Sequence, residues 1–114
     1  MTEQPADART RGLATAHRAM TVFDQEPPPA EASEDIAHVR AWLAHPWQPW
    51  HHPAHQAINR LVCAPRSLYS PRQRQAIEVA DCVIGVADTA HPCHVGWMSY
   101  WADKAEEKAR GLGV

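Results

Sequence analysis

The sequence predicts an all-α protein, a compact bundle of four to five helices joined by connectors rich in proline and tryptophan. Apolar residues recur at helical spacing in several segments, and no segment alternates apolar and polar residues as a half-buried strand does. Most of the ten prolines in the 114-residue chain fall between these segments, and a helix interior tolerates proline poorly. A chain of this length can bury a core within one domain.

The first expected helix runs from about Asp7 to Phe23. Its apolar stripe is modest, with Leu13, His17 and Met20 at positions i, i+4 and i+7. The helix has to end before Pro27, because the consecutive prolines there lack an amide hydrogen and disfavour helical geometry in the preceding residue.

The segment from Asp24 to Asp35 holds five acidic residues and no basic one, a composition typical of an extended, solvated linker. We therefore expect residues 1–30 to form an N-terminal helix followed by an acidic, proline-rich linker, and residues 31–114 to form the helical core domain. The sequence leaves open whether the first helix packs on this core.

Two helices are expected on either side of a tryptophan-rich connector. Ser33 is suited to cap a helix from about Glu34 to Ala44, since its side chain can bond to a free amide of the first turn. Residues 45–53 contain three prolines and cannot continue that helix. A short helix then begins at Pro53 and ends near Cys63. The inner faces consist of Ile36, Val39 and Leu43 in the first helix and Ile58, Leu61 and Val62 in the second.

The clearest helix start in the chain is Ser70 followed by Pro71, an N-cap and a first helical residue. The helix that follows, to about Ala87, has a broad apolar face, and we expect it to be the central helix with only a polar stripe in contact with water. Its apolar face consists of Ile77, Ala80, Val83, Ile84 and Ala87, and its polar stripe of Arg74, Glu78, Asp81, Gly85 and Asp88.

The last expected helix begins near Pro92 and runs to Arg110, where Gly111 is a natural stop. Within it, Glu106 and Arg110 form a favourable i, i+4 pair. One face is a stripe made up mainly of small residues, Met98, Ala102, Ala105 and Ala109.

Bulk properties exclude several classes of protein. A formal net charge of -2 gives no general attraction to nucleic acid or to an anionic membrane. The first residues lack the features of a signal peptide, and no stretch approaches the roughly 18 apolar residues of a spanning helix, so we expect a cytoplasmic protein without a membrane partner. Cys63, Cys82 and Cys93 are expected to be free thiols, the first two as small core residues.

The most unusual feature lies between Ile36 and Ile77. This stretch contains no acidic residue but five arginines and five histidines, interleaved with tryptophans. If its cations cluster in the fold, they form a positive surface for an acidic protein partner. The residues expected to bind the partner are Arg40, Trp42, Trp47, Trp50, Arg60, Arg66, Arg72 and Arg74. The alternative is structural, with solvated arginines and with tryptophans that cover the core where helices join.

Histidine and cysteine residues raise a second interpretation, a metal site. The candidate zinc ligands are His51, His55, His91, Cys93 and His94. His51 and His55 are four residues apart, but Pro53 between them places His51 ahead of the helix. No C-x-x-C or H-E-x-x-H motif is present, so the sequence implies no cofactor other than zinc bound by these residues.

No catalytic constellation is apparent, and we assign no catalytic residue. Cys93, near a helix start and beside histidines, has an alternative interpretation as a reactive nucleophile. Glu78 and Asp81 share a helix face and could form an acid–base pair, but a salt-bridged stripe that includes Arg74 explains them better.

The sequence therefore predicts a non-enzymatic protein–protein interaction module, such as a small regulator, inhibitor or accessory subunit. One alternative is a zinc-binding protein or metal-dependent hydrolase. A further alternative is single-stranded nucleic-acid binding, in which bases stack on the tryptophans and phosphates meet the arginines. The oligomeric state is not defined by the sequence.

Overall fold

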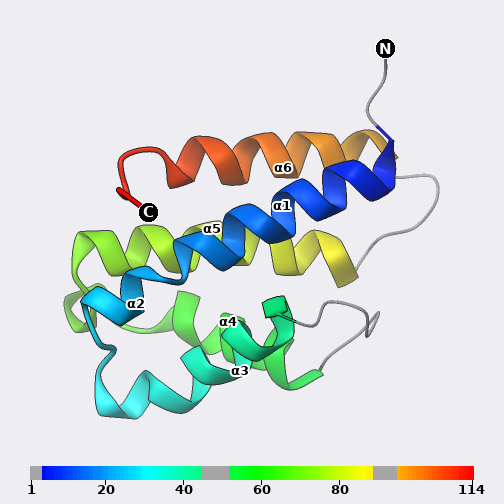
Figure 1. Ribbon diagram of the computed structural model, residues 1–114. Coiled ribbons are helices and arrows are strands. Elements are labelled where there is room, and N and C mark those ends of the chain that lie inside the picture. Colours follow the sequence, from blue (N-terminus) through cyan, green and yellow to red (C-terminus); the bar gives the residue numbers. More distant parts are fainter. Residues whose placement is uncertain (1–3, 45–51, 89–94) are drawn as a thin grey trace.

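The computed structural model describes residues 4–44, 52–88 and 95–114 (Figure 1). Within these ranges the chain is helical and has no strand, so the all-α prediction is confirmed. Five helices longer than the four-residue α2 form the bundle. The elements are α1 (Pro5–Ala19), α2 (Val22–Gln25), the 3₁₀ turn η1 (Ala30–Ala32), α3 (Ser33–Ala44), α4 (His52–Cys63), the 3₁₀ turn η2 (Arg66–Leu68), α5 (Pro71–Asp88) and α6 (Val95–Ala109).

The helices are arranged as a group of three and a hairpin of two. α1, α5 and α6 pack against one another, with α5 running opposite to the other two (Figure 1). α3 and α4 form an antiparallel hairpin, and this hairpin meets the first group where α4 contacts α5 and α3 contacts α1. α5 therefore lies between α4 on one side and the α1–α6 pair on the other, which confirms that it is the central helix.

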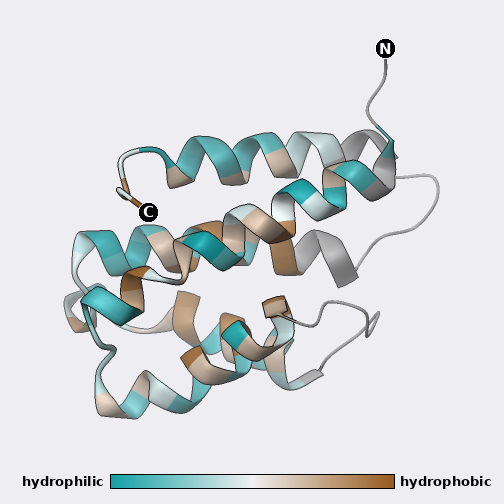
Figure 2. Ribbon diagram, viewed as in Figure 1, coloured by the Kyte–Doolittle hydropathy of each residue, from teal (hydrophilic) through white to brown (hydrophobic). Residues whose placement is uncertain are grey.

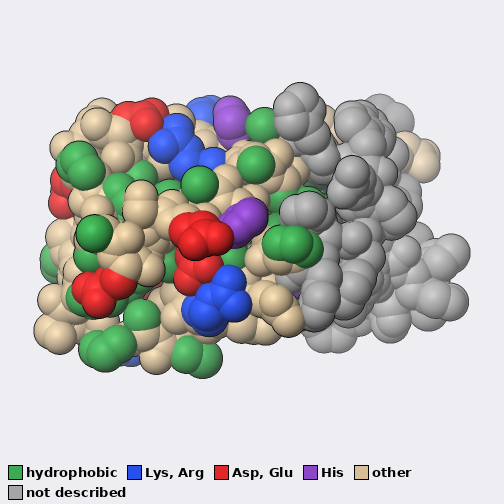
Figure 3. All heavy atoms as spheres, turned by 90° about the horizontal axis from the view of Figure 1, so that it is seen from below, with side chains coloured by type: hydrophobic (Ala, Val, Ile, Leu, Met, Phe, Trp, Pro, Cys, Tyr) green, Lys and Arg blue, Asp and Glu red, His purple; other side chains and the backbone are tan. Residues whose placement is uncertain are grey.

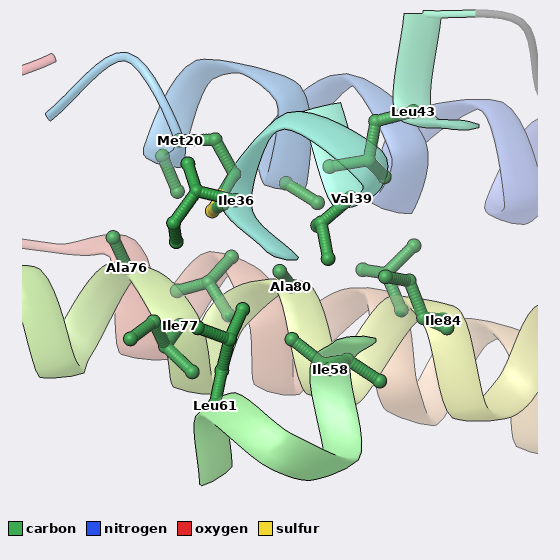
Figure 4. Packing of buried hydrophobic residues seen from close by; sticks show 14 of the residues in the cluster. Met20, Ile36, Val39, Leu43, Ile58, Leu61, Ala76, Ile77, Ala80 and Ile84 are labelled. Carbon is green, nitrogen blue, oxygen red and sulfur yellow. The ribbon is translucent and has the colours of Figure 1, made fainter. Parts of the chain in front are cut away.

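The hydrophobic core fills the space between the hairpin and α5. Side chains from α3, α4 and α5 point toward one another there, and Ile58 and Ile84 are almost fully buried (Figure 4). The most hydrophobic stretches lie at this junction, whereas the outer side of α6 is hydrophilic (Figure 2). Fully burying one such side chain contributes roughly 1.5–3 kcal/mol, so this junction supplies much of the driving force for folding.

The N-terminal helix packs on this core. Ala16, Ala19 and Met20 are fully buried and belong to the same hydrophobic cluster as the side chains of α3 to α6. Gly12 lies close to the small-residue stripe of α6, since a Cβ placed on it would be 3.7 Å from the Cβ of Ala102. Small residues on both helices let α1 and α6 approach closely, which answers the question that the sequence left open.

The region from Asp7 to Asp35 differs from the sequence-based expectation. The expected first helix is two helices, because α1 ends at Ala19 and α2 buries Val22 and Phe23 separately. The expected extended linker contains η1, and Ser33 is the first residue of α3 instead of its cap.

Contacts from α5 explain why this acidic, proline-rich segment is ordered. The side-chain amide of Gln73 donates to the backbone oxygens of Glu26 and Pro27, and the hydroxyl of Ser70 donates to the Glu26 carboxylate. Buried or half-buried carbonyls without an amide partner of their own need such donors. These partners lie more than forty positions away in the sequence, where composition alone gives no indication of them.

The predicted start of α5 and the predicted stop after α6 are confirmed in atomic detail. The hydroxyl of Ser70 accepts a hydrogen bond from the backbone N–H of Gln73 at 3.1 Å, and the side-chain oxygen of Gln73 accepts one from the backbone N–H of Ser70 at 2.8 Å. Together these two bonds make a capping box. After α6, Gly111 takes a φ of 87°, the left-handed conformation that glycine adopts without strain. None of the helices in the described ranges combines the length and apolar character needed to cross a membrane.

Candidate functional site

Three of the five arginines expected to bind a partner are bonded to carboxylates of the chain itself. Both terminal nitrogens of Arg40 bond to the carboxylate of Asp24, at 2.9 and 3.2 Å. The guanidinium of Arg60 bonds to both oxygens of Asp35, the shortest contact being 2.7 Å.

Arg72 is held by two groups from distant parts of the chain. It donates to the carboxylate of Glu26 at 3.4 Å and to the backbone oxygen of Leu112. The acidic segment before Ile36 thus supplies a carboxylate to each of the three bonded arginines.

This pairing is visible in the electrostatics of the surface. The hydrogen bond from Arg40 lowers the pKa of Asp24 below its usual value, and the bond to Asp35 raises the pKa of Arg60. On the face formed by α3 and α4, acidic side chains lie beside basic ones and do not form a patch of one sign (Figure 3). The described residues of the stretch without carboxylates therefore do not form a single positive surface in the fold.

Of the three tryptophans expected to bind a partner, the structure describes only Trp42, and it corrects the expectation for that residue. Trp42 is only 3% exposed and belongs to the hydrophobic core, so it does not face a partner. Its spacing explains this, because Ile36, Val39 and Trp42 follow one another at i, i+3 and i+6 along the inner face of α3. Trp47 and Trp50 lie outside the described residues.

The two remaining arginines, Arg66 and Arg74, meet in an open groove between α5 and α6. We call this the α5–α6 groove. It has a volume of about 420 Å³ and is lined by Arg66, Pro71, Arg74, Gln75, Glu78, Glu107 and Lys108. Arg74 donates to the backbone oxygen of Arg66 at 3.3 Å. Neither guanidinium bonds to a carboxylate in the described part of the chain.

The other charges of the groove offset one another. Lys108 lies 3.8 Å from the carboxylate of Glu78, and Lys104 lies 3.6 Å from that of Glu107. Glu78 thus pairs with α6 and not with Arg74, the partner one turn away that the sequence suggested. With both carboxylates paired, Arg66 and Arg74 leave the groove with an excess of positive charge.

Lys108 and Gln75 are site residues that the sequence analysis did not single out. The amide nitrogen of Gln75 donates to the backbone oxygens of Lys108 and Arg110, which fixes the end of α6 against α5. Only the packing of α5 on α6 brings these residues to the groove, so no local pattern identifies them. The one available signal is the place of Lys108 in the last turn of a helix, where a cation is favoured.

The predicted metal ligands fall mostly outside the described residues. His51, His91, Cys93 and His94 all do, and only His55, half-buried in α4, can be placed. In the part of the chain that the structure describes, no three potential ligands come together. Zinc binding by these residues remains a prediction.

The remaining reactive side chains have structural surroundings. Cys82 is buried as expected, and burial raises the pKa of its thiol. Cys63, the last residue of α4, is exposed, contrary to the expectation of a core residue. Asp81 is half-buried, and burial raises the pKa of its carboxyl group.

Comparisons with known protein families, with curated proteins and with solved structures gave no significant match to this chain. The feature of the chain that bears most directly on function is the α5–α6 groove, whose two arginines have no carboxylate partner within the described residues.

Proposed function

We propose that this protein is a non-enzymatic interaction module that binds an acidic segment of a partner protein in the α5–α6 groove. One observation carries the proposal. Of the five arginines in the stretch without carboxylates, Arg66 and Arg74 have no acidic partner within the described residues, and these two line the same groove. A carboxylate of the partner would pair with Arg66 and Arg74, as Asp24, Asp35 and Glu26 pair with the other three arginines.

The chemistry of arginine supports a carboxylate as the ligand group. A guanidinium presents several N–H donors in a fixed plane and can grip a carboxylate with two parallel bonds. Arg60 shows this arrangement within the chain, where its Nε donates to Oδ2 of Asp35 and its Nη2 donates to Oδ1. Arg74 is already oriented by its bond to the backbone oxygen of Arg66, so less conformational entropy is lost when a ligand binds.

A protein partner fits the described residues better than single-stranded nucleic acid. Binding of single strands depends on exposed aromatic rings on which bases stack, and Trp42 is buried. The groove itself is lined by polar and charged side chains with one proline and no aromatic residue among its described members. An acidic peptide requires only the cations that are present.

The proposal is tested with a fluorescent oligo-glutamate peptide of about eight residues, titrated at about 50 mM salt, where screening of exposed charges is weak. The double variant Arg66→Gln, Arg74→Gln is expected to bind about tenfold more weakly, equivalent to about 1.4 kcal/mol for two exposed ionic contacts. The matched control is Arg60→Gln, since Arg60 is already bonded to Asp35.

Unchanged affinity of the double variant would overturn the proposal. Tighter binding of an oligothymidine of the same length than of the peptide would replace the protein partner with nucleic acid. Circular dichroism of each variant verifies that the fold is retained.

A further inference from the structure

A second hollow lies on the other side of α6, where α6 meets the end of α1. We call it the α1–α6 hollow. It has a volume of about 270 Å³ and is lined by Thr15, Arg18, Ala19, Glu106, Ala109, Arg110 and Val114. Arg18 and Arg110 are both exposed. Neither has a carboxylate within bonding distance in the described part of the chain, and the acidic group of the hollow, Glu106, is bonded to Arg11 at 2.7 Å.

The two hollows flank the same turn of α6. The α5–α6 groove uses Glu107 and Lys108, and the α1–α6 hollow uses Glu106, Ala109 and Arg110. At 3.6 residues per turn these two sets project from opposite sides of the helix. The contacts of α6 with α5 on one side and with α1 on the other agree with this placement.

Gln75 connects the two hollows structurally. Its amide nitrogen donates to the backbone oxygen of Lys108, which lines the groove, and to that of Arg110, at 2.9 Å, which lines the hollow. The backbone of Lys108 is thus held in place relative to that of Arg110. Both sites are held by the same fixed turn of backbone.

The distribution of arginine partners across the molecule singles out these two places. Arg11, Arg40, Arg60 and Arg72 are each bonded to an aspartate or glutamate. Within the described residues Arg18, Arg66, Arg74 and Arg110 are not, and two of them line each hollow. Four cations for which the structure describes no carboxylate partner therefore lie around the end of α6.

We infer that the α1–α6 hollow is a second anion subsite of the same binding surface, so that the acidic segment of the partner crosses the last turn of α6 and places carboxylates in both hollows. This inference rests on the proposed function of the α5–α6 groove. A helix with its side chains is about 10 Å across, so an extended segment needs roughly four or more residues at about 3.3 Å each to reach both subsites. A shorter acidic peptide fills one subsite only.

The test compares two oligo-glutamate peptides, of about three and about twelve residues, with lengths chosen from the span of one helix diameter. Each is titrated against the wild-type chain, the variant Arg18→Gln, Arg110→Gln, the variant Arg66→Gln, Arg74→Gln, and the combined variant. Linking two weak contacts in one ligand raises the overall affinity. The long peptide is therefore expected to bind the wild-type chain at least tenfold more tightly than the short one, and either double variant is expected to remove most of that advantage.

Two results separate the inference from the function on which it rests. If Arg18→Gln, Arg110→Gln leaves the affinity for the long peptide unchanged while Arg66→Gln, Arg74→Gln lowers it, the second subsite is wrong and the groove stands. If neither peptide binds the wild-type chain, both proposals fall. The variant Arg40→Gln is the control for the loss of one positive charge elsewhere, because Arg40 is already paired with Asp24 in the wild-type chain.

Discussion

Arg72 donates two hydrogen bonds to the backbone oxygen of Leu112, from Nε at 2.8 Å and from Nη2 at 2.6 Å. Leu112 is 1% exposed and lies between Gly111 and Gly113, whose φ angles of 87° and 76° turn the chain back onto α5. Residues with other side chains adopt such angles only with strain. The guanidinium therefore holds a buried leucine and the chain end in place.

We predict that Arg72→Gln lowers the free energy of unfolding by about 1–3 kcal/mol, because the loss of bonds from a charged donor leaves a half-buried carbonyl without a partner. Urea denaturation of the variant and of the wild-type chain measures this. The comparison is Arg40→Gln, which breaks a more exposed ion pair and is expected to lower the free energy of unfolding by clearly less. Equal losses in the two variants would contradict the role given to Arg72.

Gly12 is the point of close approach between α1 and α6, yet it has room for a methyl group. A Cβ at this position would lie 3.6 Å from Val83 Cγ2 and 3.7 Å from the Cβ of Ala102, which are ordinary contact distances. Because alanine favours a helix over glycine by up to about 1 kcal/mol, Gly12→Ala is expected to raise the midpoint of thermal unfolding.

The larger variant Gly12→Leu has the opposite expected effect, a loss of about 1–3 kcal/mol from overpacking. Thermal unfolding of both variants, followed by circular dichroism, measures the two changes. A destabilised Gly12→Ala would show that α1 and α6 approach more closely than the structure indicates.

The start of α5 and the end of α6 could be predicted from sequence because they depend on neighbouring residues. The pair Ser70 and Pro71 marks the start of α5, and Gly111 marks the end of α6, each through a local conformational preference. The same reasoning failed for the segment from Asp24 to Asp35. Its carboxylates are bonded by Arg40 of α3, by Arg60 of α4 and by Ser70 at the start of α5. The composition of the segment itself gives no information about these distant partners.

The candidate site was predicted only in part, for the same physical reason. A stretch rich in arginine was visible in the sequence, but which arginines keep their charge available depends on the tertiary partners of each one. Arg60 and Arg66 look equivalent along the chain, and the first is saturated by Asp35 while the second lines a groove. Lys108 and Arg110 enter the two subsites from a helix that lies outside the stretch altogether.

The two described cysteines are expected to differ sharply in reactivity. Cys63 is exposed, whereas Cys82 is buried and burial raises the pKa of its thiol. The thiolate is the reactive form, and a buried thiol reacts only when the structure opens locally. In a Cys93→Ser background, we expect a disulfide reagent at pH 8 to label the thiol of Cys63 about a hundredfold or more faster than that of Cys82.

Cys63→Ser in the same background assigns the two phases. It is expected to remove the fast phase and leave the slow one. Loss of the slow phase instead would contradict the burial of Cys82.

Asp81 is expected to weaken the fold at neutral pH. Burial raises the pKa of this carboxyl group in the folded chain above its usual value of 3.8. Coulombic interactions with Lys108 and His55 oppose this effect only in part, and that with Glu78 adds to it. A carboxyl group with a raised pKa binds its proton more tightly in the folded state. Its unfavourable contribution is absent well below pH 3.8 and complete above the folded pKa.

We predict that Asp81→Asn is more stable than the wild-type chain at pH 7 and that the difference shrinks as the pH falls toward 3.8. Urea denaturation over a series of pH values from 7 down to about 4 measures the difference in unfolding free energy. A difference that does not change with pH would show that the charge of Asp81 is not what the substitution removes.

Asp24→Asn is the matched substitution with the opposite expected sign. The bond from Arg40 lowers the pKa of Asp24 below 3.8, so its ionised form is favoured in the folded chain. Its stabilising contribution is present above pH 3.8 and disappears as the pH falls through the lowered folded pKa. Asp24→Asn is therefore expected to be less stable than the wild-type chain at pH 7 and equal to it in strong acid, which makes a curve of opposite slope to that of Asp81→Asn. Parallel curves for the two variants would mean that overall charge, and not the surroundings of each carboxylate, sets the stability of this fold.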